Sequence, residues 1–414
     1  MGKRIAALVL AACMALPLFG CGSKLAAQSL TEGVTARTID THIDLTDDSS
    51  AVMDFAAALL RQTTKEEGVL LSPVSLLYAL GMTANGAAGT TLSQLEQATG
   101  MNRDTLNDYL YTYRMSLPEN TKKCKLSLAN SLWVRDIFRV EDSFLDNCVS
   151  YYDAEVYRSA FDEAMKNDLN HWVSKQTDGM IDKLLEQAPG ERTMLYLVNA
   201  VCFDAKWKKP YEKDDIQKGV VFTAADGTRQ TADLLWSQES LYLSDDNTTG
   251  FMKYYDGGRY AFVGLLPNEG VSIADYVAGL TGGKLHVLLN DPQHGTVEAA
   301  IPRFKASSSL ELSDALKAMG VTDAFDSAAA DLRAMGGAPN DQLYVSAVLH
   351  KTYLELDENG TKAAAVTAVA NDAGSAEPPE VHRVVLDRPF VYMIVDTHAN
   401  LPLFLGTVPT NSND

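Results

Sequence analysis

The sequence predicts an α+β fold built around antiparallel sheet, and two features of its hydrophobic pattern carry that prediction. Apolar residues in the first half recur mainly at helical spacing, whereas the second half contains strand-like segments bounded by Gly, Pro or Asp. Helices followed by strands favour an α+β domain over repeating βαβ units, and we find no internal repeat. A chain of 414 residues with 46% hydrophobic content can bury a large core.

End signals and apolar spacing predict the helices. In residues 72–87, Ser72 occupies the capping position and Pro73 the first helical position, and the segment runs into glycines. The other two predicted helices are 51–64 and 165–181.

Strands are predicted where apolar residues alternate, or where short apolar runs end at a breaking residue. They cover 125–134, 194–207, 260–267, 296–304, 342–356 and 388–396. Between the last two lies Asp357–Leu386, which contains about twenty mostly small side chains and two prolines near its end. A long, weakly packing loop between two strands needs a functional reason.

The charge balance and the N-terminal sequence limit which partners the protein can have. The chain has 54 Asp and Glu against 35 Lys and Arg, so the sequence predicts no nucleic acid partner. Two basic residues precede an apolar run from Ile5 to Phe19, which is typical of an export signal and too short for a membrane span. The run ends in the letters LFGC, which resemble a bacterial lipobox with a lipid on the Cys21 thiol; a plain export signal is the alternative. We therefore expect an exported protein, lipid-anchored to the bacterial cell envelope or cell surface, with a signal peptide over 1–20, a flexible tether over 21–48 and one domain over 49–414.

The sequence contains no evident catalytic site. The motifs G-x-S-x-G, H-E-x-x-H and G-x-G-x-x-G are absent, as is a phosphate loop. Ser72 and Ser75 could be nominated as nucleophiles, but a helix cap and a buried hydroxyl explain them. The stretch Asp245–Asp256 lacks the Glu that closes a calcium loop and is interpreted as a surface turn. We expect no catalytic residue, metal or cofactor.

The cysteines also give no sign of a metal site or a redox site. Beyond Cys13 and Cys21, the chain has Cys124, Cys148 and Cys202, with no C-x-x-C spacing for a zinc cage or redox pair. An odd number leaves at least one free thiol, and the apolar sequence around all three predicts buried structural cysteines.

Several segments together resemble the serpin family, and the resemblance runs from about Val52 to Val408. The matching segments, in chain order, are GVLLSPVSLLYALGMTANGAAGTTLSQL, LANSLWV, LNHWVSKQTDGMIDKLL, LVNAVCFDAKWKKPY, AIPRFK, LKAMGVTDAF, LYVSAVLHKTYLELDENGTKAAAVTA and DRPFVYMIVD followed by LFLGTV. The resemblance implies a helical cluster with three mainly antiparallel sheets and an exposed reactive loop over about 358–380. It agrees with the α+β fold predicted from the hydrophobic pattern.

The resemblance also gives the long loop a role. In serpins the segment after the DENGT hinge is a bait that a protease cuts, and the cut loop enters the central sheet as a new strand. An entering strand buries one side chain in every two, and the alternate positions here are small or β-branched, without charge or proline. A helix is the alternative for TKAAAVTAVA, although it would span only about three turns. The implied hinge residues are Glu358, Gly360, Thr361, Lys362, Ala363, Ala364, Ala365, Val366 and Thr367.

The family spacing from Glu358 places the reactive bond between Gly374 and Ser375, with a one-residue slip at Ala373 as the alternative. All three residues are small, which favours a protease with a shallow apolar pocket, elastase-like or subtilisin-like; a papain-like cysteine protease is a further alternative. The implied function is irreversible suicide inhibition by a monomer that forms a covalent complex with its target serine protease.

Other residues match the family by position. Ser72, Ser75, Asn199 and His350 match the polar cluster over which the sheet opens, although each could also be an independently satisfied buried group. Trp207 and an ion pair from Arg303 to Glu358 match the region where the loop enters.

Two other functions compete with inhibition. A non-inhibitory serpin, acting as a chaperone or ligand carrier, would have the same fold but more often a charged or bulky hinge residue. A substrate-binding lipoprotein or lipid-anchored hydrolase fits the export signal and leaves the series of matching segments unexplained.

Overall fold

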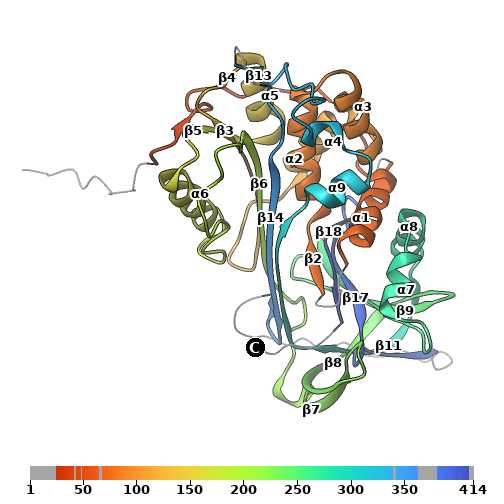
Figure 1. The fold of residues 1–414 in the computed structure, drawn as a ribbon. Helices are drawn as coiled ribbons and strands as arrows, with labels where there is room; N and C mark the ends of the chain where they lie inside the picture. Colours follow the sequence, from red (N-terminus) through yellow and green to blue (C-terminus); the bar gives the residue numbers. More distant parts are fainter. Residues whose placement is uncertain are drawn as a thin grey trace, which may run out of the picture.

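The structure, a computed structural model, describes residues 25–41, 43–47, 49–64, 68–338, 342–361 and 380–409. Figure 1 shows three β-sheets with a cluster of helices packed at one end, which confirms the predicted α+β fold. Several predicted features lie outside the described residues: the signal peptide 1–20, Cys21, hinge residues 362–367, and the reactive bond with its alternative, 373–375.

The helices begin and end at recognisable signals. Pro73 is the first residue of α2, which ends at Gly86. α6 begins after Asp162, whose carboxylate accepts from the Met165 N–H. The helices of the described residues are α1 (Ser49–Thr63), α2 (Pro73–Gly86), α3 (Gly89–Thr99), α4 (Arg103–Ser116), α5 (Asp142–Tyr152), α6 (Glu163–Gln176), α7 (Ile273–Ala278), α8 (Gly282–Asn290) and α9 (Ser313–Ala318), with short 3₁₀ turns η1 (Lys213–Asp215) and η2 (Asp323–Phe325).

The central sheet has the strand order β1-β5-β3-β6-β15-β14-β12. Its strands are β1 (Gln28–Ser29), β3 (Cys124–Arg135), β5 (Glu155–Ser159), β6 (Leu195–Lys206), β12 (Phe304–Glu311), β14 (Ala347–Asp357) and β15 (Gly360–Thr361).

A second sheet has the order β16-β11-β8-β9-β10-β17-β18-β2, with β7 paired to β8, and a third pairs β13 with β4. Their strands are β2 (Val69–Leu71), β4 (Arg139–Val140), β7 (Ile216–Thr223), β8 (Arg229–Asp245), β9 (Thr248–Tyr254), β10 (Tyr260–Pro267), β11 (Gln293–Pro302), β13 (Gly336–Gly337), β16 (Val381–Val385), β17 (Phe390–Asp396) and β18 (Leu401–Val408).

The two faces of β6 meet different halves of the core. One set of alternate residues, which includes Leu197 and Val201, joins the main core that also contains α2. The other set, which includes Val198 and Ala200, joins a second core with Leu169 of α6. Because every second residue of a strand points to the same face, the central sheet separates α2 from α6.

Three predicted elements end at different places. The helix predicted to Ile181 ends at Gln176, because the chain reverses through Asp178 and Gly179, both at positive φ. The strand predicted over 296–304 is two strands, since β11 pairs with β8 in the second sheet and β12 pairs with β14 in the central sheet, with Arg303 between them. The strand predicted from 342 starts as β14 only at Ala347.

The start of the described chain lies against the body. β1 is the edge strand of the central sheet and pairs with β5, and the Ala27 N–H donates to Asp168 of α6 at 2.6 Å. Ala27 and Leu45 are both buried, so part of the segment 21–48 packs on the domain. Within the described residues, no helix is long and apolar enough to cross a membrane.

The three cysteines among the described residues are free. Cys148 and Cys202 are buried and Cys124 is half-buried, and burial raises the pKa of Cys124 and of Cys202 to about 11. They are therefore neutral thiols at pH 7. The predicted burial is confirmed for Cys148 and Cys202, whereas Cys124 is only partly covered. The stretch with a faint calcium-loop pattern is the tight turn between β8 and β9, in which Asp245 pairs with Thr248.

Candidate functional site

The central sheet contains a parallel seam at the place where the family resemblance puts strand insertion. β6 and β14 run side by side in the same direction (Figure 1), and their register runs from Tyr196 opposite Ala347 to Cys202 opposite Tyr353. We call this pairing the seam. Because parallel pairing is slightly less stable per residue than antiparallel pairing, the seam is a weak line in the sheet.

At one end of the seam, which we call the entry end, the two strands part and β15 lies between them. Thr361 of β15 is opposite Ala205 of β6 and Leu356 of β14, and it runs antiparallel to both strands. Gly360 has φ +143°, and a Cβ there would lie 2.1 Å from the Ala205 carbonyl oxygen, so the position requires glycine. Gly360 and Thr361 therefore already lie between β6 and β14.

Aromatic side chains hold this entering chain. The Thr361 hydroxyl is 2.9 Å from the Tyr255 hydroxyl, and Thr361 is 1% exposed. Tyr255 stacks on Trp207 with ring centroids 4.3 Å apart. The Trp207 indole N–H donates to the Asp357 carbonyl at 3.0 Å, and its backbone N–H donates to the Asn359 carbonyl at 3.0 Å. Trp207 thus fixes the turn from which β15 starts.

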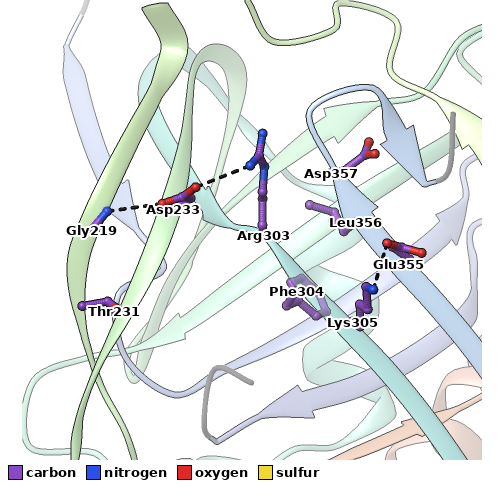
Figure 2. A pocket seen from close by; sticks show the side chains of 9 residues that line it. All are labelled: Gly219, Thr231, Asp233, Arg303, Phe304, Lys305, Glu355, Leu356 and Asp357. Carbon is purple, nitrogen blue, oxygen red and sulfur yellow. Dashed lines mark hydrogen bonds and ion pairs between the residues drawn. The ribbon is translucent and has the colours of Figure 1, made fainter. Parts of the chain in front are cut away.

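The predicted ion pair is present at the same end. Arg303 Nη2 lies 2.7 Å from Glu358 Oε2, and Nη1 lies 3.4 Å from Asp233 Oδ2. Figure 2 shows the contact between Arg303 and Asp233, which both line a cavity of about 350 Å³. Arg303 is the residue at which the chain crosses between the two sheets, so this contact joins the second sheet to the start of the reactive loop.

The four polar residues predicted to form a cluster meet under the middle of the seam. His350 and Asn199 are opposite each other across it, and His350 Nδ1 is 2.7 Å from Asn199 Oδ1. The Ser72 backbone N–H donates to His350 Nε2 at 3.0 Å, so Nδ1 carries the ring proton and donates to Asn199. The Asn199 amide donates in turn to the Ser75 carbonyl, at 2.8 Å, and to its hydroxyl. Opening the seam must break the bond between His350 and Asn199.

Burial decides the chemistry of this cluster. His350 is fully buried, and desolvation lowers its pKa to about 4, so the ring is neutral at pH 7. Ser72 and Ser75 are also 0% exposed, so neither hydroxyl can reach a substrate. Ser72 sits at the cap position of α2 as predicted, but its side chain makes no capping bond and its backbone binds His350 instead. In the part of the chain that the structure describes, no three His, Cys, Asp or Glu side chains could hold a metal.

Three contacts of this site were missed by the sequence prediction. Asn130 of β3 accepts from the Asn199 amide at 2.6 Å, Asp233 is the second acceptor of Arg303, and Tyr255 binds Thr361. Each partner is at least 69 residues away in the chain, so no local pattern could have identified it.

Comparisons of sequence agree with this arrangement. The model of the family described as Serpin (serine protease inhibitor) matches residues 50–410. Serpin B9 from Homo sapiens is 31% identical over 379 residues, which cover 86% of this chain and 98% of that protein.

Comparisons of structure extend the agreement. The crystal structure of tengpin, a thermophilic serpin, in its native state aligns with a TM-score of 0.87 at 39% identity, and the alignment covers 93% of this chain and 99% of tengpin. The latent state of tengpin aligns with a TM-score of 0.79 at 37% identity, over 90% of this chain and 100% of tengpin.

Proposed function

The chain belongs to the serpin family, a family described as serine protease inhibitors and not as enzymes, and we propose that it is an irreversible suicide inhibitor of elastase-like or subtilisin-like serine proteases. One observation carries the proposal: β15 already lies between β6 and β14, antiparallel to both. A cut reactive loop can continue from Thr361 along the seam without any change of register.

From the register of β15 we infer where each following residue would lie after insertion. Continuing from Thr361, Thr367 would lie between Asn199 and His350, because it is six residues further along an antiparallel strand. Thr361 points into the core, so the residues at alternate positions after it, Ala363, Ala365, Thr367 and Val369, would point the same way. The hydroxyl of Thr367 would then reach the polar cluster as the bond between Asn199 and His350 breaks, which keeps the buried polar atoms satisfied.

Insertion replaces one parallel pairing by two antiparallel ones. From Thr361 to Gly374 the chain could add about 40 Å of strand, at roughly 3.3 Å per residue. If about a dozen residues gain ladder bonds worth roughly 0.5–1.5 kcal/mol each, the gross gain is on the order of 10 kcal/mol. This is as large as the whole stability of an ordinary domain, so the uncut form persists for kinetic reasons.

Whether the protease is inhibited depends on the relative rates of loop insertion and of ester hydrolysis. The protease serine attacks the carbonyl of the scissile bond, which we place at Gly374 with Ala373 as the alternative, and forms an acyl-enzyme while the new amine at the next residue leaves. If insertion outruns hydrolysis of that ester, the protease is carried along the seam and its catalytic groups are distorted. A displacement of about 1 Å can cost a hundredfold in rate.

The N-terminal sequence supports a proposal about where in the cell the inhibitor acts. We propose that Cys21 carries a lipid and holds the inhibitor at the cell envelope or cell surface, which would confine inhibition to proteases that approach the cell. The basic residues, the short apolar run and the letters LFGC support this proposal. Metabolic labelling with a lipid analogue, compared with a Cys21→Ala variant, tests it independently of protease inhibition.

The first experiment mixes the mature protein with elastase and, separately, with subtilisin, followed by denaturing gels and mass spectrometry. We expect a covalent complex of summed mass and a released peptide that begins at or beside Ser375. A Thr361→Arg variant should be cut without forming the complex, because Arg would place a charge at a position that is 1% exposed. Lys362→Glu, on the opposite face of the entering strand, is the matched control and should still form it.

Cleavage of the wild-type protein without a covalent complex, and without a gain in thermal stability, would contradict inhibition. That result would favour the non-inhibitory carrier or chaperone.

A further inference from the structure

At the far end of the seam, two side chains close the gap below the last pair of sheet residues. The Ser346 backbone N–H donates to the Leu195 carbonyl at 2.9 Å, and the Ser346 hydroxyl accepts from the Met194 N–H at 2.8 Å. The Tyr344 hydroxyl donates to the Arg192 carbonyl at 2.6 Å. We call the side-chain bonds of Tyr344 and Ser346 the far clasp.

One side of the far clasp is fixed to the rest of the sheet. The Arg135 guanidinium donates to the carbonyls of Thr193 at 2.7 Å, Gly190 at 3.0 Å and Ala160 at 3.1 Å. The Arg135 backbone N–H also donates to the Met194 carbonyl at 2.9 Å. The segment 190–194 therefore belongs to the β3–β6 half of the sheet, and the far clasp joins that half to the segment leading into β14.

The register shows why this closure matters. Gly374 lies 13 residues after Thr361, so an antiparallel continuation would place it opposite Arg192 on one side and Leu343 on the other. In the same register, residues 371 and 373 would lie level with Ser346 and Tyr344. The last four residues before the scissile bond would occupy the space that the far clasp now closes.

Resting on the proposed function, we propose that Tyr344 and Ser346 are positioning residues of inhibition, because the far clasp must open before the cut loop can complete its insertion. A cavity of about 540 Å³ lies beside it, lined by Gly190, Glu191, Arg192, Thr193, Tyr344 and Ser346. Both clasp side chains are half-buried and border this space, so Tyr344 can leave the Arg192 carbonyl without displacing a packed core. The far clasp holds β6 and β14 together in the uncut protein. After cleavage it slows the last part of loop insertion, which competes with hydrolysis of the ester.

The test measures how acyl-enzyme divides between trapped complex and released, cut inhibitor. Added hydroxylamine cleaves the ester and raises the released fraction, so that both products are measurable for the wild-type protein. Tyr344→Phe and Ser346→Ala should each raise the ratio of trapped to released product by roughly two- to tenfold, the equivalent of one ordinary hydrogen bond. The association rate constant with the protease should not change, because the far clasp acts after the loop is cut.

Two matched variants control for a loss of stability alone. Tyr78→Phe removes another tyrosine bond to a backbone carbonyl, that of Leu110 at 2.8 Å, within the helical cluster. Ser272→Ala removes another serine oxygen that accepts a backbone N–H, that of Asp275 at 3.0 Å. The Tyr78 bond joins α2 to α4 and the Ser272 bond caps α7, so neither joins β6 to β14, and neither variant should move the partition ratio.

A second measurement separates the clasp from the inhibitory function. A synthetic peptide with the sequence of residues 361–374 is added to uncut protein, and its uptake is followed by the rise in thermal stability. The two clasp variants should take it up faster than the wild type and the two controls.

If the wild type traps protease and the clasp variants match it in both measurements, the clasp proposal is overturned and the inhibitor remains. If no protease is trapped but the variants take up the peptide faster, the clasp stands and the inhibitory function fails. If neither trapping nor faster uptake occurs, both proposals fail.

Discussion

The seam and the block formed by β10, β17 and β18 are built from the same kind of strand but are held together differently. In the block the pairing is antiparallel throughout, and every residue of all three strands is buried. In the seam the pairing is parallel, and its middle rests on the hydrogen-bonded pair His350 and Asn199, both 0% exposed.

The difference indicates where this fold can rearrange. Apolar packing in the block has no alternative partner that would replace it, so any opening there exposes surface to water. Hydrogen bonds across the seam can be exchanged for bonds to an incoming strand, and the net cost is small if each buried polar atom finds a new partner. The comparison predicts that substitutions in the block change stability alone, whereas changes at the seam also affect insertion.

Phe404→Ala should have the largest effect on stability and none on partition. Phe404 of β18 is fully buried, with its ring 6.3 Å from that of Phe203. Truncation should cost about 3–5 kcal/mol in the free energy of unfolding of both the uncut and the loop-cut protein, measured with denaturant. A change in the ratio of trapped to released protease would show that the block takes part in insertion, and would contradict the distinction between the block and the seam.

Acid should weaken the seam through His350. Its folded-state pKa of about 4 lies below the ordinary value of 6.5, so the unfolded chain binds the proton more readily. The free energy of unfolding should therefore fall as pH drops from about 6.5 to about 4, by up to roughly 3 kcal/mol from this group, and level off below that. Denaturant unfolding across this pH range measures the slope.

The contribution of His350 is isolated by substitution. His350→Gln should remove most of that slope, whereas His382→Gln, in β16 of the second sheet, should leave it in place. An unchanged slope in the His350 variant would mean that other groups account for the acid sensitivity.

Much of the fold could be predicted from local sequence. α2 was identified from Ser72, Pro73 and the terminal glycines, because these residues mark the two ends of the helix locally. The break at Arg303 could not be, because residues 296–304 have the pattern of one strand and their division depends on pairing with two different sheets. Strand ends that depend on a distant partner leave no mark in a single segment.

The candidate site, too, could be predicted only in part. The alternation of small residues after Gly360 suits a strand that enters a sheet, but the residues of the polar cluster came only from family resemblance. Tyr344 and Ser346 gave no signal, because a Tyr and a Ser in a strand-like segment are ordinary. Their importance appears only with the strand pairing and the hydrogen bonds that join them to Arg192 and Leu195, about 150 residues earlier in the chain.

The smallest effect is expected at the entry end, from the ion pair of Arg303 and Glu358. Their side chains are 31% and 33% exposed, so the pair should contribute about 0–1 kcal/mol to the free energy of unfolding and less at high salt. Charge reversal in Glu358→Arg should nevertheless shorten the lifetime of the uncut form on warming, because Arg303 would repel the turn that starts β15. Asp233→Asn is the matched control, since it weakens the other contact of Arg303, at 3.4 Å, without touching the loop. If Glu358→Arg leaves both inhibition and the lifetime unchanged, the pair is an ordinary surface contact, and the entry end is held by Trp207, Tyr255 and Thr361 instead.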